Sequence, residues 1–320
     1  SRDDNDRFLD LMEMYYAQPR EVKLADARPD VYYQVGVTPD GTERPRTDRV
    51  NREMADTWAK KTPRHAPHPV QGADPKWRFF WRIGPRLPEG ATAFPEMNAE
   101  PVIPLGLADQ WAPVMDAWGN KLLGTAQVVA AMLGHGLRLS DPGALTSLMK
   151  YGSHLLAPTG ADLDQWHGGA KPGTVLAGFH YDLNLMSLHG KARYPGLFIW
   201  TREGIRMPVR VPEGTLLVQA GIQLEWLTAG RIQRGYHEVV VSEATREVYE
   251  REKITRGEGA QCWRVSSTMF FHVAADQDLY PLPGIQWDES NEEKRVQYPR
   301  IKAGQQVFEE LQAISLATRS

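Results

Sequence analysis

From residue 151 onward the chain is a series of short apolar runs separated by turn signals. Turns are marked by Pro212-Glu213-Gly214 and by the polar stretch 228–231. The runs expected to form strands are 153–157, 173–180, 185–189, 196–201, 207–211, 215–220, 236–242 and 262–273. Strands this short and this frequent are typical of an antiparallel barrel or jelly roll. We therefore predict a mainly β fold with a double-stranded β-helix (jelly-roll) core.

Helices are expected outside that core. Apolar residues recur at three- and four-residue spacing over 5–18 and 107–137, which predicts amphipathic helices, and a shorter helix is expected over 142–149. The charged insert 243–259 and the segment 305–315 also read as helices. Residues 26–75 are polar and rich in proline and arginine, so we expect irregular surface structure with short strands.

The chain shows no internal repeat and no clear linker, so we predict one domain over 1–320. Its expected parts are a helical and irregular N-terminal part (1–150), the jelly-roll core (151–280) and a C-terminal tail and helix (281–320). The aromatic-basic segment 76–84 is expected to be a strand or turn that anchors the N-terminal part to the core. The alternative for this segment is a substrate lid that carries cationic groups.

Charge and cysteine content narrow the class of protein. The formal net charge is −3 and no basic run occurs, which argues against nucleic acid as a partner. No apolar stretch approaches the roughly 20 residues that span a bilayer. Cys262 is the only cysteine, so intrachain disulfides are excluded and a reducing, cytoplasmic location is expected. The sequence gives no sign of the oligomeric state.

His180-x-Asp182 and the later His237 form a candidate metal site. Residues two apart on a strand face the same side, so His180 and Asp182 can both face the barrel interior, and a neighbouring strand can supply His237. Two imidazoles and one carboxylate occupy one face of an octahedral Fe(II) and leave three positions open. The His-x-Asp pair alone is a weak signal, since such pairs at strand edges are commonly structural, and the distant histidine strengthens it.

Arg264-Val265-Ser266 is a second candidate binding element. Arg264 and Ser266 also fall on one face of a strand, and a guanidinium fork beside a hydroxyl can hold a carboxylate away from the metal. The alternative for Arg264 is a buried structural salt bridge. His189 and His272 lie in expected strands, where they either line the pocket or sit in the core.

The substrate pocket is less well defined by the sequence. The aromatic residues that could wall it are Trp77, Phe79, Phe80 and Trp81. The basic residues that could hold an acidic substrate are Arg78, Arg82, Lys150 and Arg193.

Several segments resemble, in order, the isopenicillin N synthase-like and 2-oxoglutarate- and Fe(II)-dependent dioxygenases. The segments 178–182 and 185–188 resemble that family's His-x-Asp strand pair, and 194–200 resembles its next strand. The segments 211–221 and 223–230 resemble the approach to the second histidine, here His237. Arg264-Val265-Ser266 resembles the family's carboxylate clamp, and 298–304 resembles its C-terminal tail.

The resemblance implies a catalytic iron centre formed by His180, Asp182 and His237, with Arg264 and Ser266 binding the cosubstrate. It implies Fe(II), 2-oxoglutarate and O2, with succinate and CO2 released as a small organic substrate is hydroxylated, desaturated or cyclised. A first alternative is an oxidase of the isopenicillin N synthase kind, in which the clamp holds the substrate's own carboxylate. A second is a barrel-shaped binding protein without catalysis.

Two features depart from the family pattern. The stretch 155–158, Leu-Leu-Ala-Pro, stands where many members carry a tyrosine near the oxo acid. The insert 243–259 lengthens the distance in sequence from His237 to Arg264. For the clamp to stay in place, this insert must lie outside the barrel.

Overall fold

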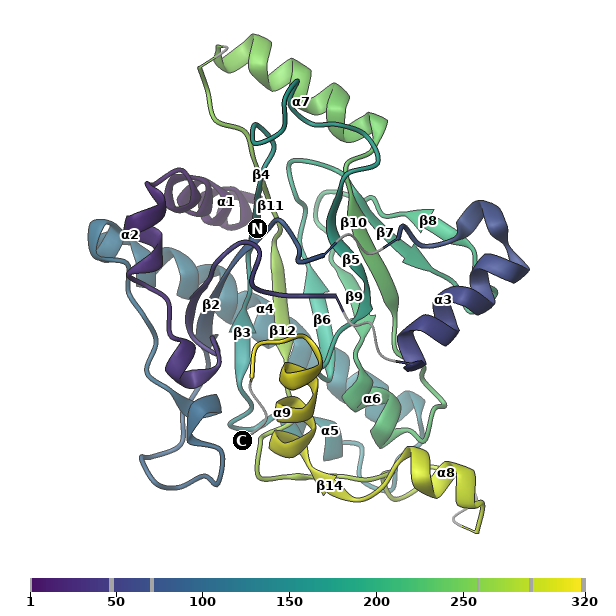
Figure 1. The fold of residues 1–320 in the computed structure, drawn as a ribbon. Coiled ribbons are helices and arrows are strands. Elements are labelled where there is room, and N and C mark those ends of the chain that lie inside the picture. Colours follow the sequence, from purple (N-terminus) through teal and green to yellow (C-terminus); the bar gives the residue numbers. More distant parts are fainter. Residues whose placement is uncertain (1, 46–48, 70–71, 258, 288–289, 318–320) are drawn as a thin grey trace.

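The computed structural model describes residues 2–45, 49–69, 72–257, 259–287 and 290–317. The fold is rich in antiparallel strands, and helices lie outside the curled sheets (Figure 1). The larger sheet of the described residues has the strand order β11-β4-β2-β3-β12-β6-β9, with β1 paired to β2. Its strands are β1 (Gly36–Thr38), β2 (Trp77–Ile83), β3 (His154–Leu156), β4 (Thr159–Asp162), β6 (Met186–His189), β9 (Leu217–Ala220), β11 (Trp263–Val265) and β12 (Thr268–Phe271).

A second sheet has the order β5-β10-β7-β8, and a small third one pairs β13 with β14. The second sheet consists of β5 (Val175–Tyr181), β7 (Leu197–Trp200), β8 (Arg206–Pro208) and β10 (Tyr236–Val240). The third consists of β13 (Asp278–Leu279) and β14 (Ile301–Lys302). All strand pairs within these sheets are antiparallel, as the short runs and turns of the sequence predict.

The α-helices are α1 (Arg2–Tyr16), α2 (Arg20–Leu24), α3 (Arg49–Lys61), α4 (Ala108–Gly136), α5 (Ala144–Met149), α6 (Ile222–Leu227), α7 (Glu243–Arg256), α8 (Glu292–Gln297) and α9 (Ala303–Ala313). Short 3-10 helices cover Pro29–Val31, Pro63–His65, Pro95–Asn98 and Leu105–Leu107. None of the described helices is long and apolar enough to cross a membrane.

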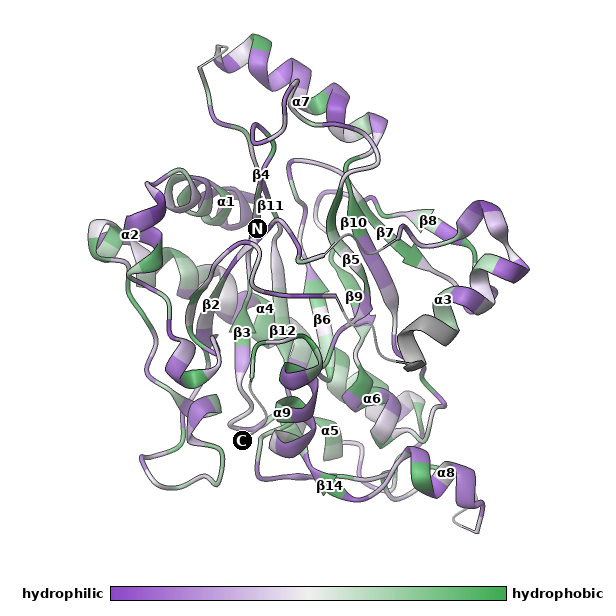
Figure 2. Ribbon diagram, viewed as in Figure 1, coloured by the Kyte–Doolittle hydropathy of each residue, from purple (hydrophilic) through white to green (hydrophobic). Residues whose placement is uncertain are grey.

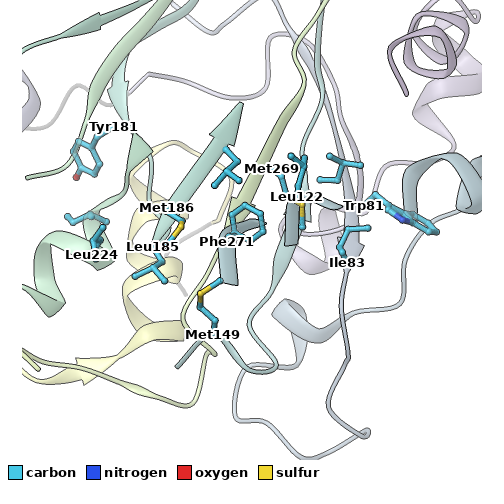
Figure 3. Close-up of a cluster of buried hydrophobic side chains, with 14 of the residues drawn as sticks. Trp81, Ile83, Leu122, Met149, Tyr181, Leu185, Met186, Leu224, Met269 and Phe271 are labelled. Carbon is cyan, nitrogen blue, oxygen red and sulfur yellow. The ribbon is translucent and has the colours of Figure 1, made fainter. Parts of the chain in front are cut away.

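The core lies between α4 and the larger sheet. Ile83 of β2 and Leu122 of α4 are both buried there, beside Met269 and Phe271 of β12 (Figure 3). Gly119 of α4 allows the helix to approach closely, because a Cβ at that position would lie 2.3 Å from the Ile83 side chain. The colouring by hydropathy shows green segments on the central strands and a largely purple α7 (Figure 2).

Most expected elements are present. The expected long helix is α4, the anchoring segment 76–84 is the fully buried strand β2, and the charged insert is α7. Several elements were not predicted. They are the helices α2, α6 and α8 and the strands β4, β13 and β14. The prediction of one strand over 262–273 is wrong, because this segment forms two strands, β11 and β12, which are separated by residues 266–267.

The prediction for 26–75 is wrong in part. This stretch contains the helix α3 as well as the short strand β1, and residues 46–48 and 70–71 lie outside the described residues. Its polar and proline-rich composition conceals α3, whose Trp58 is buried against Phe179 and Trp200. Strand β2, from the N-terminal part, lies between β3 and β4 in the larger sheet. The N-terminal part therefore supplies a strand to the sheet that borders the site.

Candidate metal centre

The pairing of β5 with β10 brings the two candidate histidines together. His180 on β5 lies opposite His237 on β10 in the antiparallel register, and their ring centroids are 4.1 Å apart. Asp182 follows the last residue of β5 and faces the same side as His180, as the two-residue spacing predicts. The three residues predicted from separate parts of the sequence therefore meet at one point.

The geometry of the three side chains suits one small cation. One ligand atom from each lies within 4.8 Å of the others. Asp182 Oδ1 is 3.6 Å from His237 Nε2 and 3.9 Å from His180 Nε2. A divalent metal lies roughly 2.0–2.2 Å from nitrogen and oxygen ligands, so small side-chain rotations bring all three atoms into contact with it.

Neighbouring groups orient these side chains. His180 Nδ1 lies 2.6 Å from the Gly178 carbonyl oxygen, which accepts its proton and leaves Nε2 free for a cation. Ser187 Oγ donates a hydrogen bond of 2.5 Å to Asp182 Oδ2, the oxygen that faces away from the histidines. His237 Nδ1 lies 2.5 Å from the side-chain amide of Gln219. Each member of the triad thus has a second contact that fixes its direction.

The charge states also suit metal binding. Burial and the neighbouring His237 lower the pKa of His180 to about 3, so this imidazole is neutral at pH 7. Burial opposes ionisation of Asp182, but the nearby histidines outweigh it and lower the pKa of this carboxyl. Neutral imidazoles and an ionised carboxylate are the forms that bind a divalent cation.

Arg264 and Ser266 line the same cavity as the triad, and the cavity measures about 450 Å³. Arg264 lies on β11, and Ser266 follows that strand. Arg264 Nε donates to the Pro195 carbonyl oxygen at 3.1 Å. Ser266 Oγ accepts from the backbone N–H of Thr159 at 2.9 Å, and its own hydroxyl proton is free to face a ligand. The side chains predicted to form the clamp therefore border the triad's cavity.

The guanidinium of Arg264 fits an anionic ligand. Arg264 is 5 % exposed, yet among the described residues it forms no ion pair with a carboxylate. Burial lowers the pKa of Arg264 to about 10. A buried cation without a counter-ion is costly, and a ligand carboxylate in the cavity would supply the missing charge. No carboxylate among the described residues forms the structural salt bridge that was the alternative role for Arg264.

Both departures from the family pattern can be located. Ala157 borders the cavity without a hydroxyl, and the nearby Thr159 hydroxyl donates to Ser266 Oγ instead. Helix α7 lies at the outer end of the molecule beyond β4 and β11, and only its first two turns border the cavity (Figure 1). The insert therefore does not displace Arg264 from the cavity.

The predicted aromatic wall is mostly wrong. Trp77, Phe79 and Trp81 are buried in the core, and of the four aromatic residues only Phe80 borders a cavity next to the triad, a smaller one of about 70 Å³. Alternation along a fully buried strand gives no hint of which face meets a pocket, and the sheet pairing decides it.

Of the four basic residues predicted to hold an acidic substrate, only some border the cavities beside the triad. Arg82 donates to the Met97 carbonyl oxygen at 2.6 Å, and Lys150 borders a separate surface hollow. Arg193 lines the large cavity, but Asp10 and Glu13 neutralise it. Arg78 borders both cavities beside the triad.

Other residues that border the triad carry no recognisable signal in the sequence. Lys76 and Glu43 line both cavities, and neither stands in a recognisable motif. His189 lines the large cavity, whereas His272 borders only the smaller one. These residues are far apart in the sequence, and the order of the strands in the sheet brings them to the same cavity.

Several solved structures with a similar fold are oxygenases. No protein-family profile and no curated protein matches the sequence. A 2OG-Fe(II) oxygenase family protein from Caulobacter crescentus has 21 % identity and a TM-score of 0.69, covering 98 % of this chain and 87 % of that one. A full-length Neurospora crassa protein in complex with alpha-KG has 17 % identity and a TM-score of 0.68, covering 98 % and 83 %.

A third solved structure is a dioxygenase for auxin oxidation from Arabidopsis thaliana, in complex with 2-oxoglutarate. It has 17 % identity and a TM-score of 0.54, and the match covers 90 % of this chain and 84 % of that one. At these identities the likeness shows the fold. The chain has the fold of the 2-oxoglutarate- and Fe(II)-dependent oxygenases, which confirms at that level the resemblance read from its motifs.

Proposed function

We propose that this protein is a non-heme Fe(II) oxygenase that uses 2-oxoglutarate and O2 to oxidise a small organic substrate, with release of succinate and CO2. One observation carries the proposal. A two-histidine, one-carboxylate cluster shares a cavity with a buried arginine that has no acidic partner among the described residues. This combination fits a metal and an anionic metal ligand together, rather than either one alone.

In this proposal His180, Asp182 and His237 hold Fe(II), which supplies the oxidative chemistry when bound. Arg264 and Ser266 bind the far carboxylate of 2-oxoglutarate and so orient its other end toward the metal. Ser187 and the Gly178 carbonyl hold the direction of the metal ligands. The protein's contribution is to position the reactants and to exclude bulk water.

The strand order supports the finer fold assignment. We infer that β3-β12-β6-β9 and β5-β10-β7-β8 are the two four-stranded halves of a double-stranded β-helix. In this arrangement β5 and β10 lie side by side in one half, which places His180 opposite His237. A small-molecule substrate and a cytoplasmic location stay predictions from the sequence.

Anaerobic titration with Fe(II) and 2-oxoglutarate tests the proposal. We expect a visible metal-to-ligand charge-transfer band that needs both components, and succinate release coupled to O2 uptake. Asp182→Ala should abolish the band and lower Fe(II) affinity at least 10-fold. Loss of a residue that only supports a metal ligand already costs about 10-fold or more, and loss of the ligand itself should cost at least as much. Asp276→Ala, which changes a carboxylate outside the described cavities, is the matched control and should leave both unchanged.

The outcomes separate the alternatives. Fe(II) binding without the band would refute the use of 2-oxoglutarate and favour the oxidase of the isopenicillin N synthase kind, in which Arg264 and Ser266 bind the substrate carboxylate. Unchanged iron affinity in Asp182→Ala would refute the metal centre and favour the non-catalytic binding protein.

A further inference from the structure

We infer that the substrate is an organic acid and that Arg78 binds its carboxylate. This inference rests on the proposed function and adds the substrate class to it. Arg78 lies on β2 and borders both cavities that contain His180 and Asp182. Arg78 and Arg264 lie on different strands, and both line the larger of these cavities.

The guanidinium of Arg78 is only partly paired. Its Nη1 lies 2.8 Å from Glu43 Oε2, whereas Nε and Nη2 have no hydrogen-bond partner among the described residues. The side chain is 8 % exposed, so water does not readily serve these donors. A buried donor left unpaired costs about 1–3 kcal/mol, which a ligand acceptor would recover.

The unpaired atoms form a binding edge. Nε and Nη2 lie on the same side of the planar guanidinium, and two parallel N–H groups there match the two oxygens of a carboxylate. The ion pair with Glu43 uses the opposite nitrogen, and a lysine would serve such a pair equally well. Packing over the Phe80 ring, with Cζ 4.2 Å from its centroid, holds the guanidinium plane in place.

The neighbouring charges leave Arg78 available. Lys76 Nζ lies 2.5 Å from Asp74 and 3.6 Å from Glu43, so Lys76 is paired with two carboxylates. Burial opposes ionisation of Glu43, but Arg78 and Lys76 lower the pKa of Glu43 to about 2, and it stays charged. Glu43 therefore fixes Nη1 of Arg78 without reaching the other edge.

The cavity as a whole favours an anion. Its acidic lining residues are Glu43, Asp182 and Glu247. Among its basic lining residues Arg193 and Lys76 are neutralised by carboxylates, whereas Lys191, Arg210 and Arg264 form no ion pair with a described carboxylate. A bound divalent metal adds further positive charge. Such a cavity attracts negatively charged ligands and disfavours cations.

Binding of matched acids and amides tests the inference. Benzoate, phenylacetate, hexanoate and decanoate, each with its primary amide, are titrated by calorimetry into the Fe(II)- and 2-oxoglutarate-loaded protein without O2. We expect at least one acid to bind the wild type about 10-fold or more tightly than its amide, since a charge-assisted pair discriminates on that scale. Arg78→Gln should remove this preference and leave the affinity for 2-oxoglutarate within about twofold.

Two further variants test whether lost stability or lost bulk charge, rather than the Arg78 fork, explains a loss of acid preference. Arg78→Lys keeps a cation for Glu43 but removes the two-pronged edge, so we expect wild-type thermal stability with most of the acid preference lost. Arg210→Gln removes the same charge from an exposed position on the cavity lining, and should keep the preference. Equal loss in Arg210→Gln would show a bulk charge effect and overturn the role of Arg78.

Other results would also overturn the inference. These are amides that bind the wild type as tightly as their acids, an acid preference that survives Arg78→Gln, or weaker 2-oxoglutarate binding in that variant. Failure of the proposed function looks different, because the charge-transfer band would then be missing from the wild type itself.

Discussion

Replacing Arg264 by methionine should make the ligand-free protein more stable and the cosubstrate site weaker. Burial lowers the pKa of Arg264 to about 10, from an ordinary value above 12. At 1.36 kcal/mol per pKa unit, this difference corresponds to about 3 kcal/mol of unfavourable desolvation. The substitution also loses the hydrogen bond to the Pro195 carbonyl, worth about 1 kcal/mol. The net expected stabilisation is about 2 kcal/mol.

Methionine has a similar length and fills the same space without a charge, so the packing around β11 should survive. Removal of the charged fork should weaken 2-oxoglutarate binding by about 10- to 100-fold. For a chain of this size we expect the melting temperature of the ligand-free protein to rise by about 3 °C. The larger the cost of burying the guanidinium, the larger this rise.

Two measurements check both halves of the prediction. Thermal unfolding without ligand gives the stability change, and anaerobic titration followed by the visible band gives the 2-oxoglutarate affinity. Lower stability together with unchanged cosubstrate affinity would refute the reasoning, because Arg264 would then be a structural residue. Arg246→Met, at an exposed i,i+4 ion pair on α7, is the control and should change neither quantity by much.

Three other sites give predictions from particular contacts. Ser187→Ala removes the hydrogen bond to Asp182 and should lower Fe(II) affinity about 10- to 100-fold in a metal titration. Burial lowers the pKa of His154 to about 3, so the unfolded chain binds more protons, and stability should fall by up to about 1.4 kcal/mol per pH unit below about pH 6.5. Urea unfolding at pH 7 and pH 5 should show a smaller fall in His154→Gln, and an identical fall would contradict this origin. Gly119→Ala should destabilise by about 1–3 kcal/mol because its Cβ overlaps the β2 packing, whereas Gly124→Ala, with nothing within 4 Å, should be neutral or stabilising in the same assay.

The elements with a strong local signal were predictable. Helix α4 repeats its apolar residues over 29 positions, and the strands after residue 151 are separated by turn residues. Helix α6 was not predictable in the same way, because it has only 6 residues and follows Gly221 within a strand-rich region. The break between β11 and β12 depends on pairing with β4 on one side and β3 on the other, which no local pattern encodes.

The candidate site was likewise predictable only in part. His180 and Asp182 share a face because a strand alternates its side chains, so their proximity follows from two-residue spacing alone. The contact between His180 and His237 depends on the register of β5 with β10. The cavity's other wall comes from β2, whose seven buried residues do not distinguish the side that faces the site from the side that faces the core.

The sequence by itself determined the residue types of the candidate centre: two histidines, a carboxylate and an arginine with a serine two positions later. It also determined the strand-rich class, because short-range periodicity is set by backbone geometry. Only the tertiary structure decided that Arg264 lacks an acidic partner in the described chain and that Arg78 is half paired. Charge pairing depends on distances of a few ångströms between segments far apart in sequence, and those distances exist only once the sheets have formed.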